Sequence, residues 1–172
     1  MQSLDETDLK ILSLLQADGD VTNLQLAKSV DLSPSSCLQR VRRLRNAGYI
    51  RGFVSVIDIS KIASSITVYA NVLLSEQNVR RFTIFERAIQ KIPEILECSL
   101  VGGDFNYFLK VISRDLQHFN EIVQSMIEMD IGIKTFTIFV EVRNVKRDPF
   151  IPLEVLVKGR AEKERRDAAR KP

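Results

Sequence analysis

Cysteine, histidine and tryptophan are scarce in this chain of 172 residues, which has two cysteines, one histidine and no tryptophan. Cys37 and Cys98 lie far apart and form no CxxC pair, so we expect neither a disulfide framework nor a zinc knuckle, but two small buried apolar side chains. His118 has no partner residues at metal-ligand spacing, and the carboxylates are scattered. Neither a Gly-x-Ser-x-Gly motif nor a phosphate-binding glycine loop occurs. The sequence therefore predicts a protein that is not an enzyme and that holds no metal or cofactor.

Long hydrophobic runs are missing too. No window approaches the roughly 18 unbroken apolar residues that a membrane-spanning helix requires. The opening residues, MQSLDETDLK, are polar and acidic, unlike a secretory signal. The chain is 45% hydrophobic and 27% charged, which is typical of a globular protein. We expect a cytoplasmic protein of one or two domains with no membrane partner.

Acidic side chains are absent from residues 33–57, although that stretch carries five arginines and the whole chain has a net charge of only +3. Basic residues prevail again from Lys158 onward. An arginine-rich helix face is often only solvated surface. Two basic zones around a mixed centre nevertheless favour a polyanionic partner.

Helix signals divide the first fifty residues into three short helices. Asp5, Thr22 and Ser33 are suitable N-caps, and each precedes apolar residues at helical spacing. Pro34 occupies the first position of the third helix, where its missing N–H costs nothing, and Gly48 is a suitable left-handed stop. Because only a few residues separate the second and third helices, the pattern predicts a helix-turn-helix.

The third predicted helix, within residues 33–47, carries the polar side chains expected of a recognition helix. In a helix-turn-helix, the N-terminal part of the second helix of the motif enters the major groove. Gln39 can form two hydrogen bonds with adenine and Arg40 two with guanine, whereas Arg43 lies one turn later and would reach the phosphate backbone. Serine hydroxyls and free N–H groups at a helix start suit phosphate oxygens. The predicted DNA-binding residues are Ser33, Ser35, Ser36, Gln39, Arg40 and Arg43.

Residues 66–145 alternate between strand and helix patterns in the order β-α-β-β-α-β, which is that of a ferredoxin-like fold. The loop GGDFN is expected to join the second and third strands as a hairpin. Helical periodicity places apolar residues of both helices inward, among them Val79, Leu116 and Ile127. Two helices on one face of the sheet leave an apolar face that we expect a partner subunit to cover.

The predicted fold class is α+β, with two domains and two further segments. Residues 1–52 form a winged-type helix-turn-helix domain. Residues 53–65 form a connecting strand and linker, because YIRGFVSVIDI is rich in β-formers. Residues 66–148 form the ferredoxin-like domain of sensing and dimerisation. Residues 149–172 are a C-terminal extension, in which we expect PLEVLV to be ordered by packing.

The chain from about residue 4 to 150 resembles the Lrp/AsnC (leucine-responsive, or feast/famine) family of transcription regulators. The strongest match is LSPSSCLQRVRRLRNAGYI, and LVGGDFNYFLKV resembles the family's small-molecule sensing domain. The resemblance implies a regulator of amino-acid metabolism that binds double-stranded DNA. It also implies homodimers that assemble to tetramers or octamers, with an amino-acid effector bound between dimers. The effector-binding residues that it implies are Gly102, Gly103, Asp104, Asn106 and Tyr107.

The chemistry of this loop suits an amino acid. Glycine lets backbone N–H groups approach a carboxylate, and Asp104 can accept from an α-ammonium group. Asn106, however, stands where the family commonly has a second acid. The missing charge leaves open a different effector, weak binding or no effector. GGDFNY is also what a plain hairpin turn requires, since Gly, Asp and Asn are turn formers.

Two functions of other classes remain open beside a sequence-specific regulator. One is a nucleoid-type architectural protein that binds DNA with little sequence choice and no effector. The other is a metabolite-sensing assembly whose DNA binding is vestigial. Gln39 and Arg40 favour the regulator, because they offer direct base readout in addition to charge.

Overall fold

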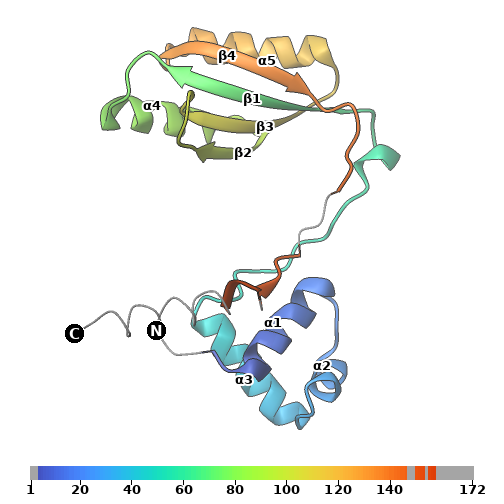
Figure 1. Ribbon diagram of the computed structural model, residues 1–172. Helices are drawn as coiled ribbons and strands as arrows, with labels where there is room; N and C mark the ends of the chain where they lie inside the picture. The colour runs from blue at the N-terminus through green and yellow to red at the C-terminus, as the bar shows by residue number, and fades with distance from the viewer. Residues whose placement is uncertain (1–3, 147–149, 154, 158–172) are drawn as a thin grey trace, which may run out of the picture. The chain divides into compact units, whose positions relative to one another are not determined.

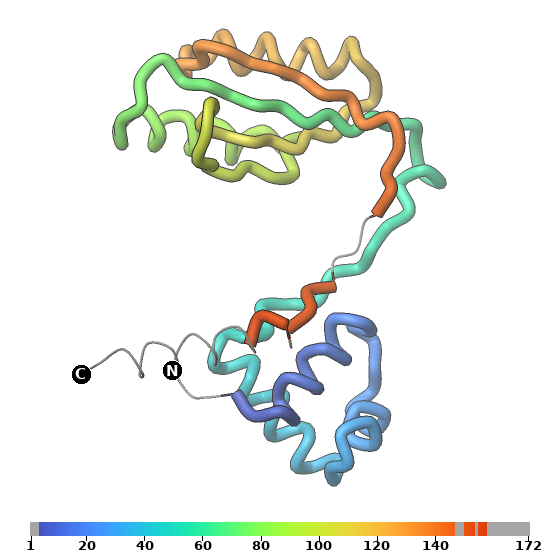
Figure 2. Tube along the Cα trace, in the orientation of Figure 1, coloured from blue at the N-terminus to red at the C-terminus, as the bar shows by residue number. Residues whose placement is uncertain are grey.

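The computed structural model describes residues 4–146, 150–153 and 155–157 (Figure 1). Residues 57–146 form one compact unit, and the described residues before and after it form another. The chain therefore passes out of the first unit and returns to it after its last strand, as the trace in Figure 2 shows. Within these described residues, no helix is both long and apolar enough to span a membrane.

Three helices build the first unit, as predicted. They are α1 (Glu6–Ala17), α2 (Asn23–Ser29) and α3 (Pro34–Asn46). The side chains of Asp5, Thr22 and Ser33 each accept a hydrogen bond from the backbone N–H three residues later, so all three predicted N-caps are confirmed. After α3 the chain turns at Gly48, whose φ of 78° lies in the left-handed region.

The three helices enclose a small apolar core. Its buried members are Ile11, Leu26, Ala27, Val30, Cys37 and Leu44. Cys37 and Leu44 belong to α3, so that helix has one edge turned into the core and the opposite edge turned to solvent. Burial of this edge fixes which residues of α3 are available to a partner.

The second unit has the predicted ferredoxin-like topology. Its elements are β1 (Ile66–Leu74), α4 (Val79–Ile89), β2 (Ile95–Leu100), β3 (Tyr107–Ser113), α5 (Leu116–Glu128) and β4 (Ile133–Val140). The strands pair antiparallel in the order β2-β3-β1-β4. Both helices lie on one face of this sheet, where Phe85 of α4 and Phe119 of α5 share a buried core with Val68 of β1 (Figure 1).

The opposite face of the sheet carries alternate residues of β1 and β3. The rings of Tyr69 and Phe108 stack there with centroids 5.6 Å apart. Lys110 pairs with Glu97 of β2 at 3.1 Å. Asn71 lies on β1 opposite Phe108, and its side-chain oxygen is buried without a hydrogen-bond partner among the described residues. Neither α4 nor α5 covers this face.

The strand predicted within residues 49–59 does not form. The described residues from 49 to 58 belong to no strand, and a 3-10 turn, η1 (Ile59–Lys61), follows them. Val54 and Val56 are 91% and 90% exposed. β-branched residues favour a strand only where a neighbouring strand supplies hydrogen bonds and packing, and the described chain supplies neither here.

Four apolar residues that were expected inside are exposed. Val79 and Leu116 are the first residues of α4 and α5, and Ile127 lies in the last turn of α5. Helical periodicity predicts that these side chains point toward the sheet. At the ends of a helix, however, little of the sheet lies beneath it, so such side chains stay exposed. Cys98 is exposed because it lies on β2, an edge strand of the sheet.

The beginning of the C-terminal extension docks on the first unit. The side chain of Gln16 in α1 binds the backbone of Ile151 twice, donating to its oxygen at 3.3 Å and accepting from its N–H at 3.1 Å. Leu153 is half-buried, whereas Val155, Leu156 and Val157 are exposed. Of the described residues of PLEVLV, only Leu153 is partly buried, and the basic tail after Gly159 lies outside the described residues.

Candidate functional site

Three serines gather at the exposed start of α3. The hydroxyl oxygen of Ser33 lies 3.1 Å from that of Ser35 and 2.8 Å from that of Ser36. Asn23, at the start of α2, donates from its side-chain amide to the carbonyl oxygen of Pro34 at 2.8 Å. This bond links the two helices of the motif and holds the serine cluster in place. The sequence contained no local signal for the role of Asn23.

Gln39 is a polar residue of α3 whose side chain has no partner within the described part of the chain. It is exposed and lies on the edge opposite Cys37 and Leu44, which the core covers. Its amide is therefore free to bind an external group.

Arg40 and Arg43 are held by acidic residues of the first helix. Arg40 Nη1 lies 2.6 Å from Asp5 Oδ2 and 2.9 Å from Asp8 Oδ1, and Arg43 also pairs with Asp8. The side chain of Asp8 is only 1% exposed, whereas that of Asp5 is 51% exposed. The sequence indicated an arginine face without compensating acids in its own helix. The structure supplies the compensation from α1.

Each group in this cluster stabilises the charge of its neighbours. The hydrogen bond from Arg40, followed by that from the backbone N–H of Asp8, holds the pKa of the Asp5 carboxyl below its usual value. The same bonds to Asp5 and Asp8 raise the pKa of Arg40. Asp5 and Arg40 are consequently both ionised at neutral pH, and the two guanidinium groups are matched by two carboxylates.

The remaining arginines of this region are placed differently. The guanidinium group of Arg45 lies over the ring of Phe53, 5.7 Å from its centroid, which is within cation–π range. Arg42 and Arg51 are exposed and form no ion pair within the described chain. The positive charge without an ion-pair partner in this region thus belongs to Arg42 and Arg51, which are not among the predicted DNA-binding residues.

The loop that precedes β3 divides into an exposed and a buried part. Gly102, Gly103 and Asp104 are exposed. Asn106 is buried, accepts from the backbone N–H of Leu74 at 2.8 Å, and donates its own N–H to Val72 at 2.9 Å. Two of the five predicted effector residues therefore face inward, since Tyr107 is buried as well.

The hydroxyl of Tyr107 donates to Glu86 Oε1 of α4 at 2.8 Å. Its ring packs against Phe85 with centroids 4.5 Å apart. Burial, then the bond to Glu86, raises the pKa of the Tyr107 hydroxyl. Burial of the thiol and the charge of Glu86 raise the pKa of Cys98 to about 11, although that residue as a whole is exposed. The contacts of Tyr107 with Glu86 and Phe85 thus fix the buried end of the loop.

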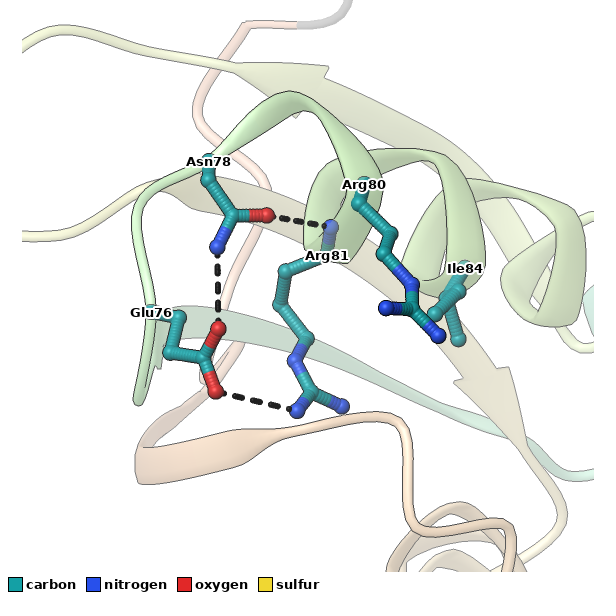
Figure 3. A pocket seen from close by; sticks show the side chains of 5 residues that line it. All are labelled: Glu76, Asn78, Arg80, Arg81 and Ile84. Atoms are coloured by element: carbon teal, nitrogen blue, oxygen red, sulfur yellow. Dashed lines mark hydrogen bonds and ion pairs between the residues drawn. The ribbon is translucent and has the colours of Figure 1, made fainter.

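A small pocket lies at the start of α4 (Figure 3). Its lining residues are Glu76, Asn78, Arg80, Arg81 and Ile84. Glu76 accepts from the Asn78 amide at 2.9 Å and from Arg81 at 3.3 Å, which lowers its pKa. None of the predicted site residues lines this pocket. Among the residues described, no group of three or more His, Cys, Asp or Glu side chains is arranged to hold a metal ion.

Comparison with known proteins agrees with both regions. Residues 4–51 match the family model of a winged helix-turn-helix DNA-binding domain, and residues 67–151 match that of the Lrp/AsnC ligand-binding domain. The leucine-responsive regulatory protein of Escherichia coli is 35% identical over 146 residues, which cover 85% of this chain and 89% of that protein.

Solved structures of similar proteins share the fold over nearly the whole length. A transcriptional regulator from Neisseria meningitidis, solved as a complex with L-Met, is 28% identical, with a TM-score of 0.83, and the match covers 90% of this chain and 99% of that one. An AsnC family regulator from Agrobacterium tumefaciens is 27% identical, with a TM-score of 0.82, covering 88% and 99%. The chain belongs to the Lrp/AsnC family of DNA-binding transcription regulators, with a helix-turn-helix domain followed by the family's ligand-binding domain.

Proposed function

We propose that the exposed edge of α3 enters the major groove of double-stranded DNA and reads base edges there. The observation that carries this proposal is the pairing of a free Gln39 with the serine cluster on the one edge of α3 that the core leaves open. Gln39 is suited to bidentate readout of adenine. Ser33, Ser35 and Ser36 are suited to bind phosphate oxygens. Arg40 and Arg43 lie on the same helix and offer N–H donors to DNA, although Asp5 and Asp8 balance their charge in the free protein.

The test of base readout is the substitution Gln39→Ala. Binding to a selected high-affinity site and to DNA of random sequence is measured for both proteins at the same stated salt concentration. If Gln39→Ala weakens the binding free energy by about 1–3 kcal/mol on the selected site and leaves binding to random DNA unchanged, Gln39 reads a base. An equal loss on both DNAs would favour the architectural alternative. That alternative draws support from Arg42 and Arg51, which are exposed and free of ion pairs among the described residues.

The effector is proposed to be a small amino acid at the loop of residues 102–107. Gly102 and Gly103 leave backbone N–H groups open to a carboxylate, and Asp104 offers an acceptor to an ammonium group. Asn106 and Tyr107 complete the proposed site by fixing the loop from its buried side. The L-Met complex of the Neisseria regulator is consistent with this ligand class.

A thermal-shift screen of the twenty amino acids tests this part, because a ligand that binds only the folded state raises the midpoint of unfolding. Asp104→Ala should abolish the shift while DNA binding without effector is unchanged. A shift that persists in this variant would place the effector elsewhere.

We also propose that the chain forms a homodimer through the sheet face that α4 and α5 leave uncovered, and that these dimers associate to tetramers or octamers. Tyr69 and Phe108 give that face its aromatic centre. Light scattering during gel filtration gives the mass of the assembly, and a monomer at micromolar concentration would contradict the proposal. The role proposed is regulatory rather than catalytic, exerted in the cytoplasm, and requires no cofactor.

A further inference from the structure

Two carboxylates share one guanidinium nitrogen at the edge of α3. Arg40 Nη1 lies 2.6 Å from Asp5 and 2.9 Å from Asp8. Asp8 is almost fully buried and also pairs with Arg43, so it holds the base of the cluster. Asp5 is half exposed and lies on the solvent side, where a DNA phosphate would approach. The two acids thus differ in how readily an external anion can replace them.

Asp5 is the carboxylate that can be replaced. Exposed ion pairs contribute little to stability, because water and salt screen them, whereas breaking a buried pair strands a charge. A phosphate or base oxygen that takes the place of Asp5 keeps Arg40 satisfied on one side, while Asp8 satisfies it on the other. The exchange removes no hydrogen bond from Arg40.

We propose that Asp5 competes with DNA for Arg40 and so limits the affinity of this regulator for DNA. The inference rests on the proposed function, since it requires the exposed edge of α3 to contact DNA. While Asp5 is in place, the two arginines and two aspartates of the cluster carry no net charge. Only when DNA displaces Asp5 does Arg40 neutralise a phosphate, and Asp5 then repels the DNA backbone. Asp5 therefore weakens all DNA complexes rather than one sequence.

The substitution Asp5→Asn separates this role from the role of Asp5 as helix cap. Asparagine caps helices as well as aspartate does, so the bond from the Asp8 N–H at 2.7 Å is retained. Only the charge is removed. Asp18→Asn is the matched control, because Asp18 lies at the other end of α1, accepts one backbone N–H in the same way, and touches none of the arginines.

Binding of sheared double-stranded DNA of mixed sequence, followed by fluorescence anisotropy over a series of salt concentrations, gives the affinity and the salt slope. Asp5→Asn is expected to bind about two- to fivefold more tightly than Asp18→Asn, which is the range of an exposed ion pair. Its salt slope should be steeper by about one counterion per subunit. In an Arg40→Gln background, the advantage of Asp5→Asn over Asp18→Asn should disappear.

Three results would overturn the inference. If Asp5→Asn and Asp18→Asn bind DNA equally well while Arg40→Gln still weakens the complex, Asp5 does not compete with DNA for Arg40. In that case α3 is still the DNA-binding element. Weaker binding by Asp5→Asn, at an unchanged melting temperature, means that Asp5 aligns Arg40 for DNA instead of withholding it. If neither Arg40→Gln nor Gln39→Ala changes binding, the proposed interface itself is wrong.

Discussion

The side-chain oxygen of Asn106 accepts the backbone N–H of Leu74 at 2.8 Å, which ties the loop before β3 to the end of β1. The Asn106 backbone extends this tie, because its own N–H donates to Val72. Asn106 is also the position at which the family resemblance implies an acid and this chain has an amide. Its contacts show that the position serves the loop structurally, whatever it does for a ligand.

Asn106→Ala should destabilise the second unit by about 1–3 kcal/mol, because it leaves the buried N–H of Leu74 without an acceptor. Asn106→Asp keeps an acceptor at the same place and should cost less. Urea unfolding of the two variants checks this order. Equal losses in both would mean that the amide group, rather than the acceptor oxygen, is what this position requires.

The Asp8 carboxylate should matter more to the stability of the helix-turn-helix unit than any exposed acid there. Asp8→Asn removes the negative charge that Arg40 and Arg43 share. We expect it to lower the free energy of unfolding by about 3 kcal/mol, which is the usual loss when one partner of a buried ion pair is removed. The midpoint of urea unfolding, followed by circular dichroism at 222 nm (a helix signal), measures this loss. Asp18→Asn is the control, and a loss no larger than that of the control would contradict the prediction.

Much of this fold could be predicted because its signals are local. Asp5, Thr22 and Ser33 mark helix starts by their own side chains, and Gly48 marks the end of the third helix. The ion pairs of Arg40 could not be predicted in this way, since Asp5 lies 35 residues earlier in the chain. Asp5 and Asp8 have a complete local role as a capping box, which gives no hint of a second one.

The absent strand near Val54 and the buried Asn106 have related causes. A strand depends on hydrogen bonds from a neighbouring segment, so the β-rich composition of residues 49–58 cannot establish that one exists. Asn106 belongs to a loop whose residues all suit a turn, and composition does not distinguish an exposed turn residue from one that anchors the loop. The sequence thus groups the loop residues as one candidate set, but it does not divide them into exposed and buried members.

Acidification should weaken the first unit through Asp5. Arg40 and the Asp8 N–H lower the pKa of Asp5 in the folded state. A group with a depressed pKa contributes stability above its unfolded pKa, about 3.9 for Asp, and that contribution is lost as the pH falls through the lower folded value. Wild-type protein should therefore lose more stability than Asp5→Asn below about pH 4. Parallel pH profiles of the two proteins would refute this role.

Cys98 should react slowly with thiol reagents despite its exposed position. Burial of its thiol, then the charge of Glu86, raises its pKa to about 11, so thiolate is scarce at pH 8. Alkylation there should be about tenfold to a hundredfold slower than in the urea-unfolded protein, with greater intrinsic nucleophilicity offsetting part of the deficit. Peptide mapping after timed alkylation separates Cys98 from the buried Cys37.

Glu86→Gln should accelerate the reaction of Cys98 at pH 8 by removing the neighbouring negative charge. If Cys98 reacts at the same rate folded and unfolded, its thiol is in free contact with solvent and the prediction is wrong.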